Sequence, residues 1–222
     1  MRTDTAHQAW DTRWSTAEGR AEWEMPDPDV CEVAKRLAGQ PEPIAALDLG
    51  CGVGRHALMF ARMGFSTTAI DMAKQGLSVL RDNAEAEGLE ISTRAAAMTE
   101  LPFDDGAFDY VLSFNVIYHG DRSVVETAFS EIRRVLKPRG TFQATMLSKR
   151  NSGFGLGTEV SPGTFVDEAG VGDDSDKVHP HFYCNASELV ALLKGFELIS
   201  LRDVAQKRPG HFHWQFVAER LP

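Results

Sequence analysis

Short apolar runs alternate with amphipathic stretches over the first two thirds of the chain. The runs have the length and apolar content of buried strands, and they lie at residues 44–49, 65–71, 89–98, 108–115 and 141–148. Between them, apolar residues recur at helical spacing. Asp121 caps one such stretch, whose apolar stripe runs from Val125 to Leu136 before Pro138 breaks it. This alternation predicts an α/β fold with a doubly wound, mainly parallel sheet.

The N-terminal segment has a different character. Residues 1–25 are polar but contain three tryptophans, which is unusual for a disordered tail. Asp27 and Pro28 then provide an N-cap and a first-turn proline, and Gly39 ends the helix that they begin. We therefore expect residues 1–40 to form an N-terminal helical cap.

The C-terminal segment completes the sheet. Residues 187–194 predict a short helix, and residues 196–205 and 211–220 alternate with period two. A turn at 207–210, rich in proline and glycine, joins the last two runs into an antiparallel hairpin. The sequence thus predicts a seven-stranded sheet in one domain spanning residues 1–222.

One long stretch, from residue 149 to 176, has no usable periodicity. It is rich in glycine and in acidic residues. Segments of this length within a compact domain are usually functional or disordered. We predict that residues 149–184 form an insertion that acts as a lid over the acceptor substrate.

Charge and cysteine content narrow the classes of partner. The chain has 23 Lys and Arg against 32 Asp and Glu, a net charge of −9, whereas a protein that acts on nucleic acid usually has a basic face. We therefore expect no nucleic-acid partner. Three scattered cysteines, with no signal peptide and no apolar span, predict a cytoplasmic protein with free thiols and no membrane association.

The glycine-rich turn after the first predicted strand indicates a nucleoside site. Gly50, Gly52 and Gly54 let backbone approach a ligand closely, and the following helix directs free N–H groups at the same place. Asp71 ends the next strand, where a carboxylate would meet ribose hydroxyls. Arg55 stands where a dinucleotide fingerprint has its third glycine, which disfavours an NAD-dependent oxidoreductase.

The segment ALDLGCGVG resembles motif I of the class I S-adenosylmethionine (SAM)-dependent methyltransferases. LPFDDGAFDYVLSFNVIYH and VLKPRGTF resemble the family's segments around the fourth strand and before the fifth. The resemblance implies a Rossmann-like methyltransferase fold, SAM as cofactor and S-adenosylhomocysteine as product. Among small-molecule enzymes, the chain is similar to the bacterial tellurite- and thiol-type methyltransferases.

The same resemblance implies a set of cofactor-binding residues. Asp71 would bind the ribose, Met72 and Met98 would flank the adenine, and Trp14 would pack on the methionine end. The family commonly has an acid where this chain has Ala97, so the backbone of Met98 would read the adenine instead. The full predicted set is Trp14, Asp48, Gly50, Cys51, Gly52, Gly54, Asp71, Met72, Ala97, Met98 and Asn115.

Histidines are the candidate catalytic residues. His119 follows the fourth strand, and His179 and His181 lie where the insertion returns to the sheet, so all three are predicted to meet at one edge. They would act as a base or orient the acceptor. His179 and His181 could instead form a structural metal site or an ordinary surface cluster, together with Cys184, His211 and His213. The spacing of these residues matches no zinc signature, and we predict no metal.

The acceptor is predicted to be a small molecule with a thiol or chalcogen nucleophile, because a thiolate forms near neutral pH and needs little help from a base. O- or N-methylation of a small metabolite is the alternative. A SAM-binding module without turnover is a second alternative, since no obligatory catalytic pair is visible.

Overall fold

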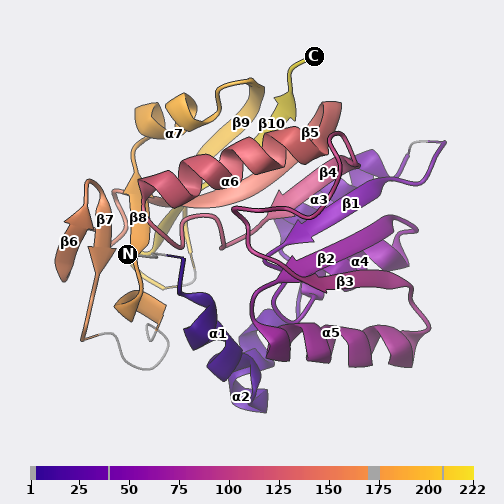
Figure 1. Cartoon of the computed structure of the whole chain (residues 1–222), viewed down its shortest axis with the longest axis horizontal. Coiled ribbons are helices and arrows are strands. Elements are labelled where there is room, and N and C mark those ends of the chain that lie inside the picture. The colour runs from indigo at the N-terminus through magenta and orange to yellow at the C-terminus, as the bar shows by residue number, and fades with distance from the viewer. Residues whose placement is uncertain (1–3, 40, 170–175, 207) are drawn as a thin grey trace.

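The computed structural model describes residues 4–39, 41–169, 176–206 and 208–222. Its centre is a mixed sheet in the order β3-β2-β1-β4-β5-β10-β9, parallel up to β5, with β10 antiparallel to both of its neighbours (Figure 1). These strands are β1 (Ala45–Leu49), β2 (Ser66–Asp71), β3 (Ile91–Ala95), β4 (Phe108–Ser113), β5 (Leu136–Ser148), β9 (Phe196–Ala205) and β10 (Phe212–Arg220). The predicted α/β fold and its C-terminal hairpin are confirmed. The hairpin turn is described only at 208–210, because residue 207 lies outside the described residues.

Helices cover both faces of the sheet. They are α1 (His7–Trp14), α2 (Ala17–Arg20), the 3-10 helix η1 (Ala21–Trp23), α3 (Pro28–Leu37), α4 (Arg55–Arg62), α5 (Lys74–Glu87), α6 (Arg122–Val135) and α7 (Ala186–Leu192). Asp27 and Asp121 cap α3 and α6 with their side chains, as predicted. Residues 1–3 and 40 of the predicted N-terminal cap lie outside the described residues. No helix in the described ranges is long and apolar enough to cross a membrane.

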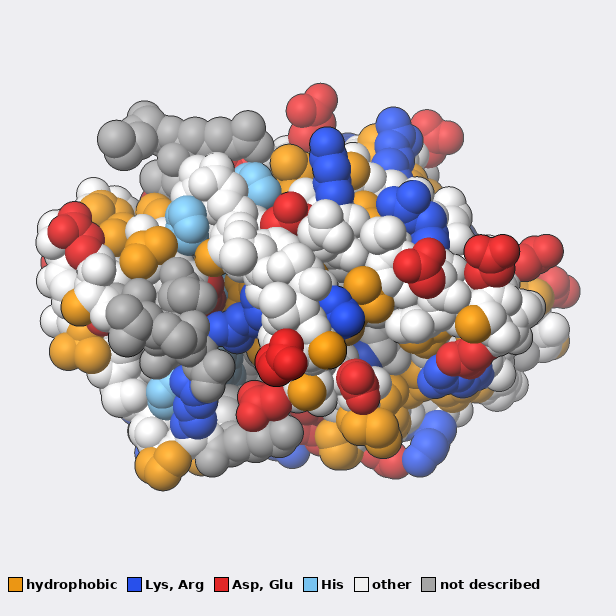
Figure 2. Space-filling model, turned by 90° about the horizontal axis from the view of Figure 1, so that it is seen from below, with side chains coloured by type: hydrophobic (Ala, Val, Ile, Leu, Met, Phe, Trp, Pro, Cys, Tyr) orange, Lys and Arg blue, Asp and Glu red, His pale blue; other side chains and the backbone are white. Residues whose placement is uncertain are grey.

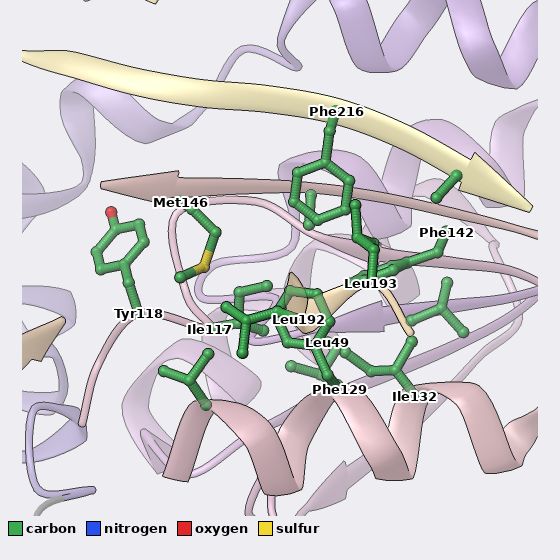
Figure 3. Close-up of a cluster of buried hydrophobic side chains, with 14 of the residues drawn as sticks. Leu49, Ile117, Tyr118, Phe129, Ile132, Phe142, Met146, Leu192, Leu193 and Phe216 are labelled. Atoms are coloured by element: carbon green, nitrogen blue, oxygen red, sulfur yellow. The ribbon is translucent and has the colours of Figure 1, made fainter. Parts of the chain in front are cut away.

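The two faces bury separate clusters because successive strand residues point in opposite directions. Val111 of β4 packs with α6 and α7, whereas Tyr110 and Leu112 pack with α3 and α4. In Figure 3, Phe129 of α6 points toward Phe142 and Phe216 of the sheet. The Phe129 and Phe142 ring centroids are 5.5 Å apart, and those of Phe142 and Phe216 are 5.2 Å apart.

The predicted boundary between α6 and β5 is wrong: the helical stripe was expected to reach Leu136 and the strand to begin at residue 141, whereas α6 ends at Val135 and β5 begins at Leu136. Leu136 already belongs to β5, which pairs with Phe108 of β4 two residues before Pro138. The apolar stripe could not reveal this, because Leu136 is buried in a strand as completely as it would be in a helix.

The prediction of seven strands is also incomplete, because the segment between β5 and α7 adds three more. They are β6 (Thr158–Ser161), β7 (Thr164–Val166) and β8 (His181–Cys184). β6, β7 and β8 are antiparallel neighbours, and β8 runs parallel to the last two residues of β5. β10 pairs with one edge of β5. β4 pairs with the other edge as far as Ala144, and β8 pairs with that same edge further along, at Leu147 and Ser148. Strands of three and four residues are too short to show periodicity in the sequence.

Candidate functional site

The glycine-rich loop after β1 is fixed by the end of β2. Gly50 and Gly52 have φ of 73° and 54°, a region that only glycine enters without strain. The amide of Gly50 donates to the carbonyl of Ile70 at 2.8 Å. The two carboxylate oxygens of Asp71 accept from the amides of Gly52 and Ala73 at 2.8 and 2.7 Å. Asp71 therefore shapes the loop as well as standing at its edge.

Asp48 and Gly54 support the loop from behind. Asp48 is buried, and its carboxylate accepts from the amide of Ala57 at 3.0 Å, in the first turn of α4. Burial raises the pKa of Asp48 to about 7. Gly54 is the N-cap of α4 with φ of 87°, and a Cβ there would collide with Leu80 of α5. Neither residue is among the described residues that line the pocket.

A pocket opens at the carboxyl ends of the parallel strands, where ligands bind in such sheets. Ten of the predicted site residues line it: Trp14, Gly50, Cys51, Gly52, Asp71, Met72, Ala97, Met98, Asn115 and His119. The strand ends of β1, β2, β3 and β4 each contribute, so residues far apart in the sequence share one cavity. Burial raises the pKa of Asp71, and the amides of Ala73 and Gly52 oppose this effect.

The N-terminal segment forms the outer wall of the pocket. Trp10 lies with its ring centroid 5.1 Å from that of Trp14 and 5.0 Å from that of Trp23, and all three line the cavity. Trp14 approaches the loop so closely that a Cβ on Gly52 would lie 3.0 Å from its ring. The indole N–H groups of Trp10 and Trp14 are buried without a hydrogen-bond partner among the described residues, so they are free to donate to a ligand.

Sequence reasoning missed several pocket residues, chiefly Trp10, Trp23, His7, Arg55 and His56. The three tryptophans in a polar segment were a usable signal. Arg55 lies with its guanidinium 5.0 Å from the ring centroid of Trp23. Burial lowers the pKa of Arg55, and Asp27 opposes it. His56 is buried beside Arg55, and burial lowers the pKa of its imidazole. The neutral ring that results accepts a hydrogen bond from the amide of Asp27 at 3.1 Å.

Two of the three predicted catalytic histidines lie together. His119 follows β4 and pairs with His181 of β8 through an isolated antiparallel bridge, with ring centroids 4.8 Å apart. Asp176, which the sequence did not single out, has its carboxylate 3.1 Å from Nε2 of His181 and 3.6 Å from Nε2 of His119. His119 lines the pocket, and His181 lies behind it.

Among the described residues, the side chains of the rest of the predicted cluster do not belong to this group. Nδ1 of His179 and the hydroxyl of Thr5 are 2.9 Å apart, which links the insertion to the N-terminal segment. Cys184 is buried with its thiol directed at the carbonyl of Leu147. His213 is buried on β10, and its ring centroid is 5.7 Å from that of Tyr118. His211 precedes β10 and lines a different cavity, beside Asn151 and Tyr183.

Comparison with known proteins places this pocket in a family. The profile of a methyltransferase domain matches residues 46–140, which span the glycine loop, Asp71 and the strand leading to His119. Residues 46–140 thus form a methyltransferase domain of the class I SAM-dependent type. For this methyltransferase, the predictions of the family, of an enzyme class and of SAM as cofactor are confirmed at the level of the family.

Individual relatives cover different parts of the methyltransferase. Glycine/sarcosine/dimethylglycine N-methyltransferase from Actinopolyspora halophila is 30% identical over 208 residues, 86% of this chain and 33% of the relative. Demethylmenaquinone methyltransferase from Thermus thermophilus is 40% identical over 108 residues, 47% of each chain. The chain thus spans between a third and a half of the length of these curated relatives.

Solved structures share the fold of the methyltransferase. A crystal structure of Burkholderia thailandensis 1,6-didemethyltoxoflavin-N1-methyltransferase, with 1,6-didemethyltoxoflavin and S-adenosylhomocysteine bound, superposes with a TM-score of 0.74. It covers 97% of this chain and 87% of its own, at 18% identity. At that identity the likeness confirms the Rossmann-like fold alone.

Proposed function

We propose that this methyltransferase transfers the methyl group of SAM to a small-molecule acceptor. The observation that carries the proposal is the pocket itself, in which the glycine loop, the Asp71 carboxylate and His119 share one cavity. SAM supplies a methyl group on a positively charged sulfur, which a nucleophile displaces in line. The chain's own residues bind and orient the two reactants and exclude water.

The pocket residues fit the parts of SAM. Each Asp71 oxygen already accepts one amide and keeps lone-pair capacity for ribose hydroxyls. Met72, Ala97 and Met98 offer apolar contacts and backbone groups for adenine. The unpartnered indole N–H groups of Trp10 and Trp14 would donate to the methionine end, beside Gly52. Asn115, Cys51 and Gly50 complete the proposed wall.

For the acceptor, we retain a thiol or chalcogen nucleophile as the first proposal. His119 lies at the edge of the cavity and would take or direct a proton, and a thiol asks least of such a base. Two relatives, glycine/sarcosine/dimethylglycine N-methyltransferase and the ubiquinone biosynthesis O-methyltransferase of Methylocella silvestris, favour nitrogen or oxygen as the alternative. On the face in Figure 2, Lys and Arg are interspersed with Asp and Glu, which suits a small molecule better than a polyanion.

The insertion at 149–184 is proposed to hold the acceptor in place through its contacts behind His119. Its described residues do not line the pocket, whose outer wall comes from the N-terminal segment. The insertion reaches the site through the pairing of His181 with His119 and through His179 with Thr5. His179 is thus proposed as a residue that positions the N-terminal wall.

We also propose a reducing, cytoplasmic location. The three cysteines are free, and Cys51 and Cys184 are buried and surrounded by the fold rather than paired. Free thiols persist where glutathione and thioredoxin keep them reduced.

Turnover of radiolabelled SAM against a panel of thiols, phenols and amines tests the proposal. We expect one class to be methylated, His119→Ala to lower turnover, and the affinity for SAM to stay near wild type, because the lost contact serves the acceptor. Val178→Ala, at an exposed position of the same insertion, is the matched control. If SAM binds but no acceptor class is methylated, the chain is a SAM-binding module without turnover.

A further inference from the structure

His119, Asp176 and His181 form a buried group of nitrogen and oxygen ligands beside the pocket. Their ligand atoms all lie within 4.8 Å of one another. His181 is 1% exposed and His119 is 9% exposed. Nε2 of His119 is buried without a hydrogen-bond partner among the described residues, although it points toward Asp176. A polar group of this kind requires an explanation.

The tautomer of His181 sharpens the question. Its Nδ1 is 2.8 Å from the carbonyl oxygen of His179, which can only accept, so Nδ1 carries a hydrogen and donates. In a neutral ring Nε2 then bears a lone pair, and that lone pair faces a carboxylate oxygen 3.1 Å away. Two lone pairs in this position repel unless a positive charge lies between them.

A metal ion placed between the three groups would satisfy all of them at once. Bonds of about 2.0–2.2 Å to a tetrahedral zinc ion place neighbouring ligand atoms about 3.4 Å apart. The two distances to Oδ2 of Asp176, 3.1 Å from His181 and 3.6 Å from His119, lie on either side of that value. A backbone carbonyl that fixes the tautomer of a histidine ligand, as that of His179 does here, is typical of metal sites.

The backbone holds the ligands in place before any ion binds. His119 and His181 belong to paired segments, in which the amide of Phe182 donates to the carbonyl of Tyr118 and the amide of Gly120 to that of Pro180, both at 2.9 Å. Of the three ligands, His119 is the one that also lines the cavity. His119 therefore connects the ligand group to the pocket.

We propose that Nε2 of His119, Nε2 of His181 and Oδ2 of Asp176 bind a divalent ion of the zinc class, with an open position toward the pocket. An ion there lowers the pKa of a bound thiol or hydroxyl, whose proton leaves to solvent, and so takes the place of His119 as the group that prepares the acceptor for methylation. This last role rests on the proposed function, whereas the binding of the ion does not.

Calorimetric titration of the chelator-treated full chain with zinc sulfate, in the absence of SAM, tests the site. We expect about one equivalent to bind, and Asp176→Asn to weaken zinc binding by at least about 100-fold, because the amide cannot supply the anionic oxygen. His213→Gln is the matched control: it removes another buried histidine next to Tyr118 that is not in the ligand set, and it should bind zinc as wild type does.

Cobalt(II) gives a second readout that does not depend on turnover. Visible absorption of tetrahedral cobalt should appear in wild type and His213→Gln and be absent in Asp176→Asn and His119→Ala, with far-UV circular dichroism unchanged as the check on folding. Unchanged zinc affinity in Asp176→Asn, or no zinc bound by wild type, would overturn the proposal and leave a His–Asp pair that shares a proton. Zinc binding without methylation of any acceptor would instead overturn the proposed function alone.

Discussion

Asp71 is the residue on which both the loop and the proposed ribose contact depend. Its carboxylate accepts from the amides of Gly52 and Ala73, so its removal leaves two donors unpaired as well as the ribose. We expect Asp71→Ala to weaken SAM binding by ~1–3 kcal/mol. Calorimetry with SAM measures the change, and Asp82→Ala, an exposed acid on α5, is the control. Equal affinities in wild type and Asp71→Ala would remove Asp71 from the site.

Asp48 gives a pH dependence whose sign can be worked out. Burial raises its pKa from 3.8 to about 7 in the folded protein, so between these values the folded chain binds a proton that the unfolded chain has lost. Through this group, the free energy of unfolding falls as the pH rises from about 4 to about 7. In Asp48→Asn this contribution should disappear. Urea denaturation across that pH range gives the free energy of unfolding of both proteins. Plotted against pH, it should fall less steeply for the variant than for wild type; parallel plots would contradict the assignment.

Among single residues, the sequence predicted those whose role depends on local geometry. Spacing placed Gly50, Gly52 and Asp71 together because a turn between two adjacent parallel strands leaves little freedom. It did not predict Asp176, whose contact with His181 depends on the path of a long insertion. It also missed Trp10 and Arg55, because a side chain's direction into a cavity is not encoded in periodicity.

The elements around the loop pack through glycine. At Gly54, both the positive φ and Leu80 of α5 exclude a side chain, whereas Gly88 has a positive φ but open space around it. We expect Gly88→Ala to cost ~1–2 kcal/mol of unfolding free energy from backbone strain alone. Gly54→Ala should cost a further ~1–3 kcal/mol, because Leu80 must move. Thermal or urea denaturation of the two variants measures the difference. Equal losses of unfolding free energy would show that Leu80 of α5 moves aside without cost.

The order and type of the core elements were predictable, since each strand and helix there is long enough to show its period. The short strands β6 and β7 were not, because their pairing is set by tertiary contacts with β8 rather than by their own pattern. The boundary at Leu136 failed for a related reason: burial is the same on either side of it.

Two segments close on the pocket from different sides. α1 packs against α5 and carries Trp10 and Trp14, which with Trp23 of η1 form the tryptophan wall of the pocket (Figure 1). The insertion reaches His119 from the other side. In hydrogen exchange, we expect S-adenosylhomocysteine alone to protect the amides of α1, because its tryptophans contact the proposed cofactor site. The described amides at 149–169 should gain protection only when the acceptor is also present. Exchange at 149–169 that is the same with and without both ligands would show that this stretch takes no part in acceptor binding.

The tryptophan wall also has a kinetic consequence. In α1 only Trp14 is buried, so what anchors this helix to the domain is chiefly one large aromatic side chain. A product enclosed by such a wall leaves no faster than the wall opens. The slower of the two steps, wall opening or methyl transfer, then limits the rate of each catalytic cycle. Substitutions in α1 remote from the reacting atoms would then change the residence time of the product, and the enzyme's speed would be set in part by its first two dozen residues.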